Sequence, residues 1–245
     1  MSIEDYFGDW SKVINLGEAN RLMNALTKLK QPICPLPRDV FKAFSLCTLD
    51  SLRVIILGQD PYPDYKNGKP TATGIAFGNS IDTPNDCYSP SLDVLMESVI
   101  DFTRPHGIIN FDPSLEKWER QGVLMLNSAL SCLAGRPGSH SLMWRPFIRE
   151  LLTNLSKYDT CMAYVLMGTE AQSFEPYIDH RLNHVMKVKH PSWYARNHQK
   201  MPTDLWYRIN DILDSHNGSR VEWYNEYKFL NETETNEEVF FAGHC

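Results

Sequence analysis

The sequence lacks long hydrophobic runs. None approaches the roughly 20 apolar residues that a membrane-spanning helix needs, and the acidic, aromatic start MSIEDYFGDW is unlike a signal peptide. We therefore expect no membrane partner and a location in the cytoplasm, or in the nucleus if the source is eukaryotic or viral. Internal repeats, low-complexity linkers and breaks in composition are also missing, which argues against a second domain.

Metal-binding patterns are missing as well. The six cysteines contain no C-x-x-C pair and follow no zinc or iron–sulfur spacing, so reduced thiols are the better interpretation. We expect neither a metal ion nor another cofactor.

Positive charge is scarce. The net charge of −6 argues against a protein that coats nucleic acid by bulk attraction. The last fifteen residues, NETETNEEVFFAGHC, carry four glutamates and no Lys or Arg, so the rest of the chain has a net charge near −2 and a local basic face remains possible. We expect one monomeric domain over residues 1–230, followed by a loosely ordered acidic tail over residues 231–245.

Short apolar runs alternate with segments of helical periodicity. The runs are continuous, as in strands buried on both faces, and they cover residues 54–57, 123–126, 163–167 and 185–188. The helix-period segments cover residues 17–29, 91–102, 145–155, 170–178 and 203–215. Strands that alternate with helices predict an α/β fold with a parallel or mostly parallel sheet.

Polar residues follow each predicted strand. The four runs end in GQDPYP, NSAL, GTEAQ and KHPS, which place Asp60, Asn127, Thr169 and His190 after carboxyl ends of strands. Ligands bind at that edge of open α/β sheets, so we expect these side chains to converge on one crevice. Each residue alone is more often a turn, surface or core residue, and the hypothesis depends on the four together.

Asp60 lies in a turn that the sequence makes stiff. Pro61 and Pro63 fix their own φ angles and push Asp60 and Tyr62 toward extended conformations. Gly58 is expected to adopt a backbone geometry closed to other residues, where the chain leaves the strand. A carboxylate held in place before the substrate arrives suits catalysis.

Several ordered motifs resemble those of the family 1 uracil-DNA glycosylases. The resemblance runs from about residue 36 to residue 223 and rests on LPRDVFKAF, VIILGQDPYP, TGIAFGN, SPSL, GVLMLNSALSCLAG, GSH, VLMGTEAQ and HPS. It implies a three-layer α/β/α sandwich around a short, mostly parallel four-stranded sheet. It also implies removal of uracil from single- or double-stranded DNA, which starts base excision repair, and a glycosylase inhibitor protein as a possible partner.

The resemblance implies a role for each residue of the base pocket. Asp60 would position the attacking water and stabilise a cationic sugar, and His190 would donate a hydrogen bond to uracil O2 as negative charge develops. Asn127 would read uracil N3–H and O4, which rejects cytosine. Tyr62 would exclude the methyl group of thymine, Phe77 would stack on the base, and the backbone around Gln59 would contact O2.

A second set of residues would hold the DNA backbone and flip the nucleotide. The resemblance assigns contacts to the backbone to Pro90, Ser91, Gly168, Thr169 and Ser192. Arg196 lies in a basic stretch that suits a phosphate, unless that stretch is a plain solvated loop. Trp193 or Tyr194 would fill the space that the flipped base leaves, unless both rings pack against the protein.

The chain departs from the family pattern in three places. Pro63 stands where the family has a histidine, and a proline cannot donate to a phosphate. The wedge loop reads HPSWY instead of HPSPL, and the proline-rich loop is reduced to TPNDCYSPSL. Two other functions stay open: a DNA clamp or polymerase accessory of the same fold, and a glycosylase that acts on a modified uracil.

Overall fold

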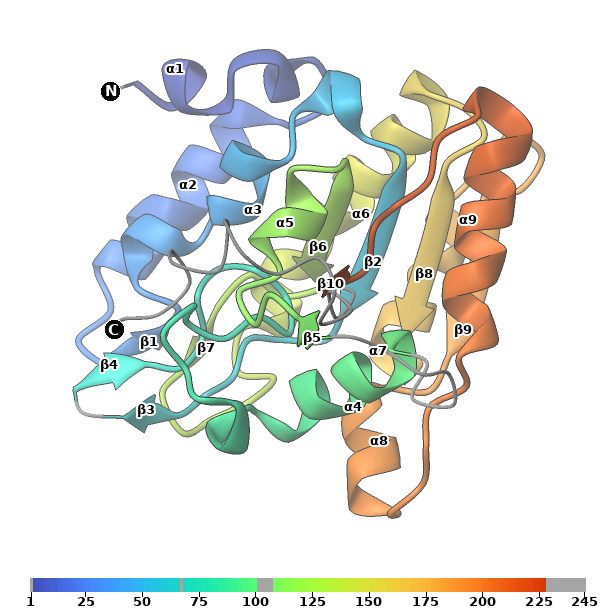
Figure 1. The fold of residues 1–245 in the computed structure, drawn as a ribbon. Coiled ribbons are helices and arrows are strands. Elements are labelled where there is room, and N and C mark those ends of the chain that lie inside the picture. The colour runs from blue at the N-terminus through green and yellow to red at the C-terminus, as the bar shows by residue number, and fades with distance from the viewer. Residues whose placement is uncertain (1, 67, 101–107, 228–245) are drawn as a thin grey trace, which may run out of the picture.

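The computed structural model describes residues 2–66, 68–100 and 108–227 (Figure 1). The predicted acidic tail lies outside these residues. The α-helices are α1 (Ile3–Phe7), α2 (Leu16–Thr27), α3 (Lys42–Leu46), α4 (Pro90–Val99), α5 (Glu116–Glu119), α6 (Ser141–Tyr158), α7 (Thr169–Gln172), α8 (Pro191–Arg196) and α9 (Asp204–Asn217). None of the described helices is long and apolar enough to cross a membrane.

The central sheet has four parallel strands in the order β6-β2-β8-β9. These strands are β2 (Val54–Gly58), β6 (Val123–Asn127), β8 (Ala163–Met167) and β9 (His184–Val188). They match the four apolar runs to within one residue at each end. The predicted α/β fold with a parallel four-stranded sheet is therefore confirmed.

The described residues also form three two-stranded sheets, which the apolar runs did not predict. Strand β1 (Ile33–Cys34) pairs with β7 (Cys132–Leu133), and β3 (Tyr65–Lys66) forms a hairpin with β4 (Lys69–Pro70). Strand β10 (Asn225–Tyr227) pairs with β5 (Ile108–Asn110). The last described residues therefore lie beside a segment from the middle of the sequence.

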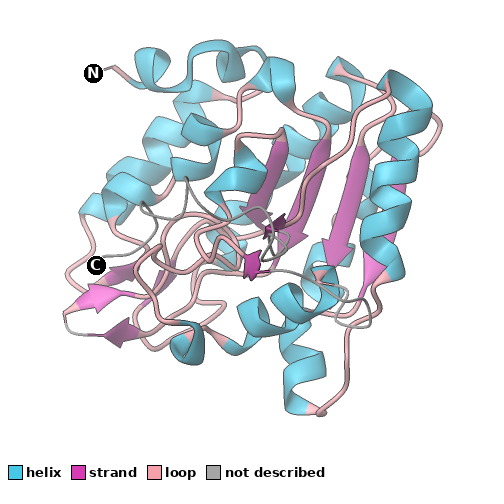
Figure 2. Ribbon diagram, viewed as in Figure 1, coloured by secondary structure: helices cyan, strands magenta, loops and turns pink. Residues whose placement is uncertain are grey.

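Side chains of the central sheet alternate between two apolar clusters. Ile55 and Leu57 face a cluster that includes side chains of α1, α2, α3 and α6, whereas Val54 and Ile56 face one that includes side chains of α4, α8 and α9. Helices therefore cover both faces of the sheet, as Figure 2 shows, and the architecture has three layers. Each fully buried aliphatic side chain contributes about 1.5–3 kcal/mol to this packing.

The predicted helix over residues 170–178 is shorter in the structure. Helix α7 ends at Gln172, and a 3-10 turn follows at Glu175–Tyr177. Pro176 has no N–H to donate and so disfavours an α-helix that runs on from α7, and it lies at the start of the 3-10 turn instead. Helix α4 spans Pro90–Val99, and the last two residues of the predicted segment 91–102 lie outside the described residues.

Candidate active site

The carboxyl ends of all four central strands lie at one edge of the sheet. Gly58 of β2 pairs with Asn127 of β6, and the N–H of Gly168 after β8 donates to the carbonyl of Val188 in β9 at 2.9 Å. Strands β2 and β8 point toward the side of the molecule where α8 lies (Figure 1). Parallel register thus brings the segments that carry Asp60, Asn127, Thr169 and His190 to the same edge.

Asp60 is held by the loop between β6 and α6, which includes β7. Its Oδ2 accepts a hydrogen bond from the N–H of Gly138. The carbonyl of the preceding Gln59 accepts bonds from the Ser128 hydroxyl and from the next N–H along that loop, at 2.8 and 2.9 Å. Burial raises the pKa of Asp60, the Gly138 bond opposes the rise, and the charge of Glu170 adds to it. The carboxylate is therefore fixed in position and poorly solvated.

A small pocket opens beside this carboxylate turn. Its lining residues are Val40, Pro61, Tyr62, Ala72, Gly74, Ile75, Phe77, Asn127 and Leu130. The Asn127 side chain is only 8% exposed, yet it makes no hydrogen bond to any other described residue. Buried polar groups in proteins are nearly always paired, so a free amide at the wall of a pocket indicates a ligand site.

Two aromatic residues shape the pocket. The Tyr62 hydroxyl donates to the carbonyl of Phe77 at 2.9 Å. Phe77 has a φ of +65°, which is uncommon for a non-glycine residue, and its ring lies 5.4 Å from that of His190 between centroids. Burial raises the pKa of Tyr62, and hydrogen bonding with Ser89 opposes the rise. Tyr62 is therefore a neutral phenol that holds a strained Phe77 in place.

Gly58 is required for a different reason from the one expected. Its φ is not in the left-handed region, so no special backbone geometry calls for a glycine there. A Cβ atom at this position would instead lie 2.5 Å from Oδ1 of Asn127 and 2.8 Å from Cζ of Phe77. Because glycine has no side chain, the Asn127 amide and the Phe77 ring can occupy the space beside Gly58.

His190 caps helix α8 with its ring. Its Nδ1 accepts the backbone N–H of Ser192 at 3.2 Å and lies 2.8 Å from the Ser192 hydroxyl. Burial and the nearby positive charge of Arg196 lower the pKa of His190 to about 4. The imidazole is therefore neutral near pH 7. Because Nδ1 accepts a backbone N–H, the ring proton is on Nε2, which is then a hydrogen-bond donor.

The residues predicted to hold the DNA backbone differ in how exposed they are and in what they contact. Pro90 and Thr169 are exposed at the first positions of α4 and α7. Ser91 is only 5% exposed, so its hydroxyl does not face solvent as a phosphate contact would. Ser192 contacts the His190 ring, which makes it a positioning residue. Gly168 has a φ of +91°, and a Cβ there would lie 2.8 Å from Cβ of His190.

Of the two rings that the sequence offered as a wedge, Tyr194 is the less accessible. It is 8% exposed and packs in the apolar cluster with side chains of α4 and α9. Trp193 is only half-buried, and the Lys189 ammonium lies 3.3 Å from the centroid of its ring. Trp193 and the exposed Arg196 are thus the accessible members of this loop. The amphipathic packing of α8 against α4 explains why Tyr194 points inward.

Sequence reasoning missed Gly138 and the role of Ser192. The GSH motif that contains Gly138 was recognised, but a backbone donor carries no side-chain signal of its contact with Asp60. Among the described residues, no group of three or more His, Cys, Asp or Glu side chains is arranged to hold a metal ion.

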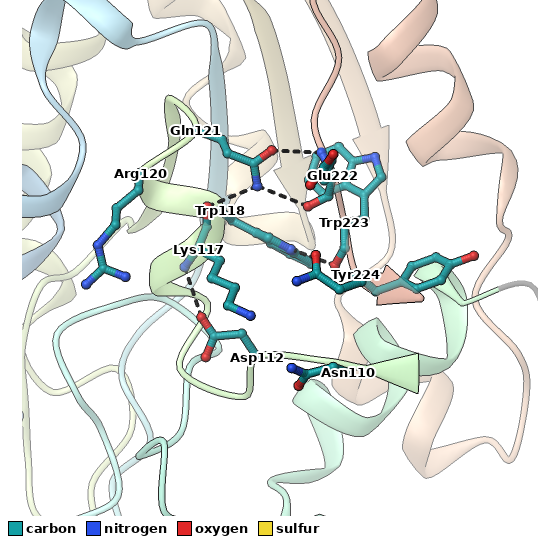
Figure 3. A pocket seen from close by; sticks show the side chains of 10 residues that line it. Asn110, Asp112, Lys117, Trp118, Arg120, Gln121, Glu222, Trp223 and Tyr224 are labelled. Carbon is teal, nitrogen blue, oxygen red and sulfur yellow. Dashed lines mark hydrogen bonds between the residues drawn. The ribbon is translucent and has the colours of Figure 1, made fainter. Parts of the chain in front are cut away.

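A second cavity, of about 250 Å³, shares no lining residue with the pocket at Asn127 (Figure 3). Its walls are joined by structural hydrogen bonds. Gln121 bonds to the backbone N–H and carbonyl of Glu222, and the Trp118 indole donates to the carbonyl of Trp223. These contacts join the segment before β10 to α5 and to the turn that follows it.

Known proteins are similar to this chain in sequence and in fold. A model of the uracil DNA glycosylase superfamily matches residues 44–214. The uracil-DNA glycosylases of Escherichia coli and Salmonella arizonae are each 34% identical over 197 residues, which cover 78% of this chain and 80% of each relative.

Solved structures show the same architecture. The crystal structure of mimivirus uracil-DNA glycosylase has a TM-score of 0.69 at 22% identity and covers 89% of this chain and 90% of its own. A variant of that enzyme in complex with UGI gives a TM-score of 0.73 at 23% identity and covers 91% and 88%. Since the family model matches well over half of the residues and the bacterial relatives exceed 30% identity, the chain belongs to the uracil DNA glycosylase superfamily.

Proposed function

We propose that this chain is a family 1 uracil-DNA glycosylase, which hydrolyses the bond between uracil and deoxyribose and leaves an abasic site for base excision repair. The observation that carries the proposal is the unpaired, buried amide of Asn127 in a pocket with Tyr62 and Phe77, whose ring packs on His190. Water adds to C1′ as the bond from C1′ to uracil N1 breaks, and the bonding electrons leave with uracil.

His190 stabilises the leaving uracil. Its Nε2–H is the free donor of the ring, since Nδ1 is engaged by Ser192. A pKa near 4 keeps the imidazole neutral at physiological pH, so it donates a hydrogen bond to O2 without first losing a proton. Uracil then departs as an anion held by that bond.

Asp60 stabilises the opposite charge. As the bond to uracil breaks, the sugar becomes oxocarbenium-like, and a carboxylate beside it lowers the energy of that cation. The half-buried position of Asp60 makes this attraction stronger than it is in water. Gly138 occupies only one carboxylate oxygen, which leaves the other to orient the attacking water.

Asn127 and Tyr62 select the base. The amide carbonyl accepts uracil N3–H, and the amide N–H donates to O4, whereas cytosine presents the inverse pattern and leaves buried groups unpaired. Tyr62 is held by its bond to Phe77 and lies where it excludes a C5 methyl group. Phe77 stacks on the base, and the segment at Gln59 contacts O2.

The DNA backbone is held by short segments around the pocket. Pro90, Gly168, Thr169 and Arg196 lie at the starts of α4 and α7 and at the end of α8. Trp193 is the accessible ring that fills the space left by a flipped base in duplex DNA. An inhibitor protein of the UGI kind, a monomeric state and a cytoplasmic or nuclear location stay predictions.

The structure argues against the two alternative functions. A protein that only clamps DNA has no need of a neutral His190 or of an unpaired Asn127 amide in an aromatic pocket, yet both features are present. A glycosylase for bulky modified uracil needs an open C5 side, where Tyr62 is hydrogen-bonded in place.

Release of uracil from matched single- and double-stranded oligonucleotides tests the proposal. We expect excision from both, and little from an oligonucleotide with a bulky 5-substituted uracil. DNA binding without release would support the clamp, and faster release of the modified base would support the third function.

A further inference from the structure

Glu119 is a fully buried acid that the proposed reaction does not use. It is 0% exposed, although glutamates are almost never fully buried unless they are paired. Its Oε1 accepts the N–H of Met125 at 2.8 Å, and its Oε2 makes no hydrogen bond to any described residue. The bond from Met125 is therefore the contact that this carboxyl provides in the interior of the described structure.

A tight turn brings the end of α5 close to β6. The helix ends at Glu119 and the strand begins at Val123, so residues 120–122 are the whole connection. Gly122 has a φ of +84°, and a Cβ atom there would overlap the carbonyl oxygen of Ser51. The chain therefore turns closely enough for a side chain at the end of the helix to reach the backbone of the strand.

Strand β6 is an edge strand of the central sheet, so its outer N–H and C=O groups have no neighbouring strand to pair with. At Met125 both groups are paired in another way. Glu119 accepts the N–H, and the C=O accepts the N–H of Ala76 at 3.1 Å. The carboxyl of Glu119 thus replaces part of a missing strand.

Met125 lies next to two walls of the base pocket. Asn127 follows it by two residues in the same strand, and its amide is the group proposed to read uracil. Ala76, which bonds to the C=O of Met125, directly precedes Phe77, whose φ of +65° is uncommon for a residue other than glycine. A strained backbone persists only where its surroundings hold it. The pairing of Met125 therefore bears on the positions of both Asn127 and Phe77.

We propose that Glu119 is a positioning residue for base excision, which fixes the outer edge of β6 at Met125 and thereby holds Phe77 and Asn127 in place. The inference rests on the proposed function. Glu119 does not line the pocket, so it acts through the backbone of Met125 and Ala76. Without its oxygen the N–H of Met125 is buried and unpaired, and the edge of the strand shifts to find another acceptor.

Two substitutions separate the hydrogen bond of Glu119 from the volume of its side chain. Burial raises the pKa of Glu119 well above its ordinary value, and the bond from Met125 opposes the rise. The charge of Glu116 adds to the rise, and that of Lys42 opposes it. These effects favour the uncharged acid, which Glu119→Gln resembles and whose acceptor oxygen it keeps. Glu119→Leu has a similar volume but no acceptor.

Single-turnover release of uracil measures the effect on catalysis. We expect Glu119→Gln to retain the wild-type rate and Glu119→Leu to be at least about tenfold slower on single strands and duplex alike, because a displacement of about 1 Å costs on the order of 10²-fold. Glu119→Asp keeps the acid but is one CH₂ shorter, so it should be slow as well, and it decides the matter if Glu119→Leu does not fold. A wild-type rate for folded Glu119→Leu or for Glu119→Asp would overturn the inference.

Asn183→Leu is the matched control, because it also removes a buried acceptor of a backbone N–H. Asn183 is 6% exposed, and its Oδ1 accepts the N–H of Met162 at 3.3 Å. These two residues precede β9 and β8, at the end of the sheet away from the pocket. Chemical denaturation should show a loss of stability in both leucine variants, whereas the rate should fall in Glu119→Leu alone. An equal fall in the rate of Asn183→Leu would point to lost stability as the cause and would reject the positioning role.

Hydrogen exchange gives a readout that does not depend on activity. In Glu119→Leu the N–H of Ala76 should exchange faster than in wild type, because its acceptor on Met125 is less firmly held. The N–H of Val165, in the central strand β8, should change no more than it does in Asn183→Leu. Unchanged exchange at Ala76 would contradict the proposal. Absence of uracil release by wild type, with exchange at Ala76 altered as expected, would reject the proposed function instead.

Discussion

Replacement of Gly58 by alanine should disable the base pocket while leaving the fold largely intact. The new Cβ would lie 2.5 Å from Oδ1 of Asn127 and 2.8 Å from Cζ of Phe77, whereas ordinary contacts begin near 3.4 Å. Both groups must therefore move by roughly 0.5–1 Å, and a displacement of about 1 Å at a catalytic constellation costs on the order of 10²-fold in rate. Overpacking of this kind lowers the free energy of unfolding by about 1–3 kcal/mol.

Single-turnover release of uracil measures the loss of rate, and chemical denaturation of the same protein measures the loss of stability. Gly17→Ala is the matched control, because its Cβ would meet only Oδ1 of Asn15 at 3.5 Å, an ordinary contact within α2. That variant should gain about 0.5–1 kcal/mol of stability and keep its rate. Excision by Gly58→Ala at the wild-type rate would refute the placement of Asn127 and Phe77 around the base.

Three further predictions concern the pocket, the wedge and the histidine. Asn127→Ala should abolish recognition of uracil, and Asn127→Asp should admit cytosine, as measured by release of either base; unchanged uracil release by Asn127→Ala would sink the assignment. Tyr194→Ala should lower the free energy of unfolding by about 3 kcal/mol and slow excision from single strands and duplex alike, whereas Trp193→Ala should slow excision from duplex alone; the reverse pattern would restore Tyr194 as the wedge. His190 has a folded pKa near 4 against about 6.5 unfolded, so its stabilising effect is complete above pH 6.5 and is lost as the pH falls toward 4. Denaturation of His190→Gln should therefore depend less on pH in that window than denaturation of wild type, and identical pH profiles would contradict a buried neutral imidazole.

The sheet and the convergence of the site were predictable from the sequence. Continuous apolar runs such as residues 54–57 and 163–167 have the length and composition of strands buried on both faces, and the structure places them there. Parallel strands bring their carboxyl ends to one edge, so the positions of Asp60, Asn127 and His190 followed from their places after the runs.

Packing and backbone contacts were not predictable in the same way. The motif HPSWY placed Tyr194 in the wedge loop, but burial of its ring depends on how α8 meets α4, which no local pattern encodes. The N–H that holds Asp60 belongs to the backbone of Gly138, so no side chain signals the contact. The strands of the β3–β4 hairpin have two residues each and are too short to show periodicity. The sequence singled out Gly58, but a glycine is needed there because side-chain atoms of Asn127 and Phe77 lie too close to where a Cβ atom would be.

We infer that Asp60 stabilises charge in the transition state and does not hold the DNA. Asp60→Asn keeps the shape of the side chain and removes its charge, so its affinity for uracil-DNA should match that of wild type. Its single-turnover rate of uracil release should be lower by at least about 10²–10³-fold. Near-normal release by Asp60→Asn, measured with protein in excess over a uracil-containing oligonucleotide, would contradict this role of Asp60.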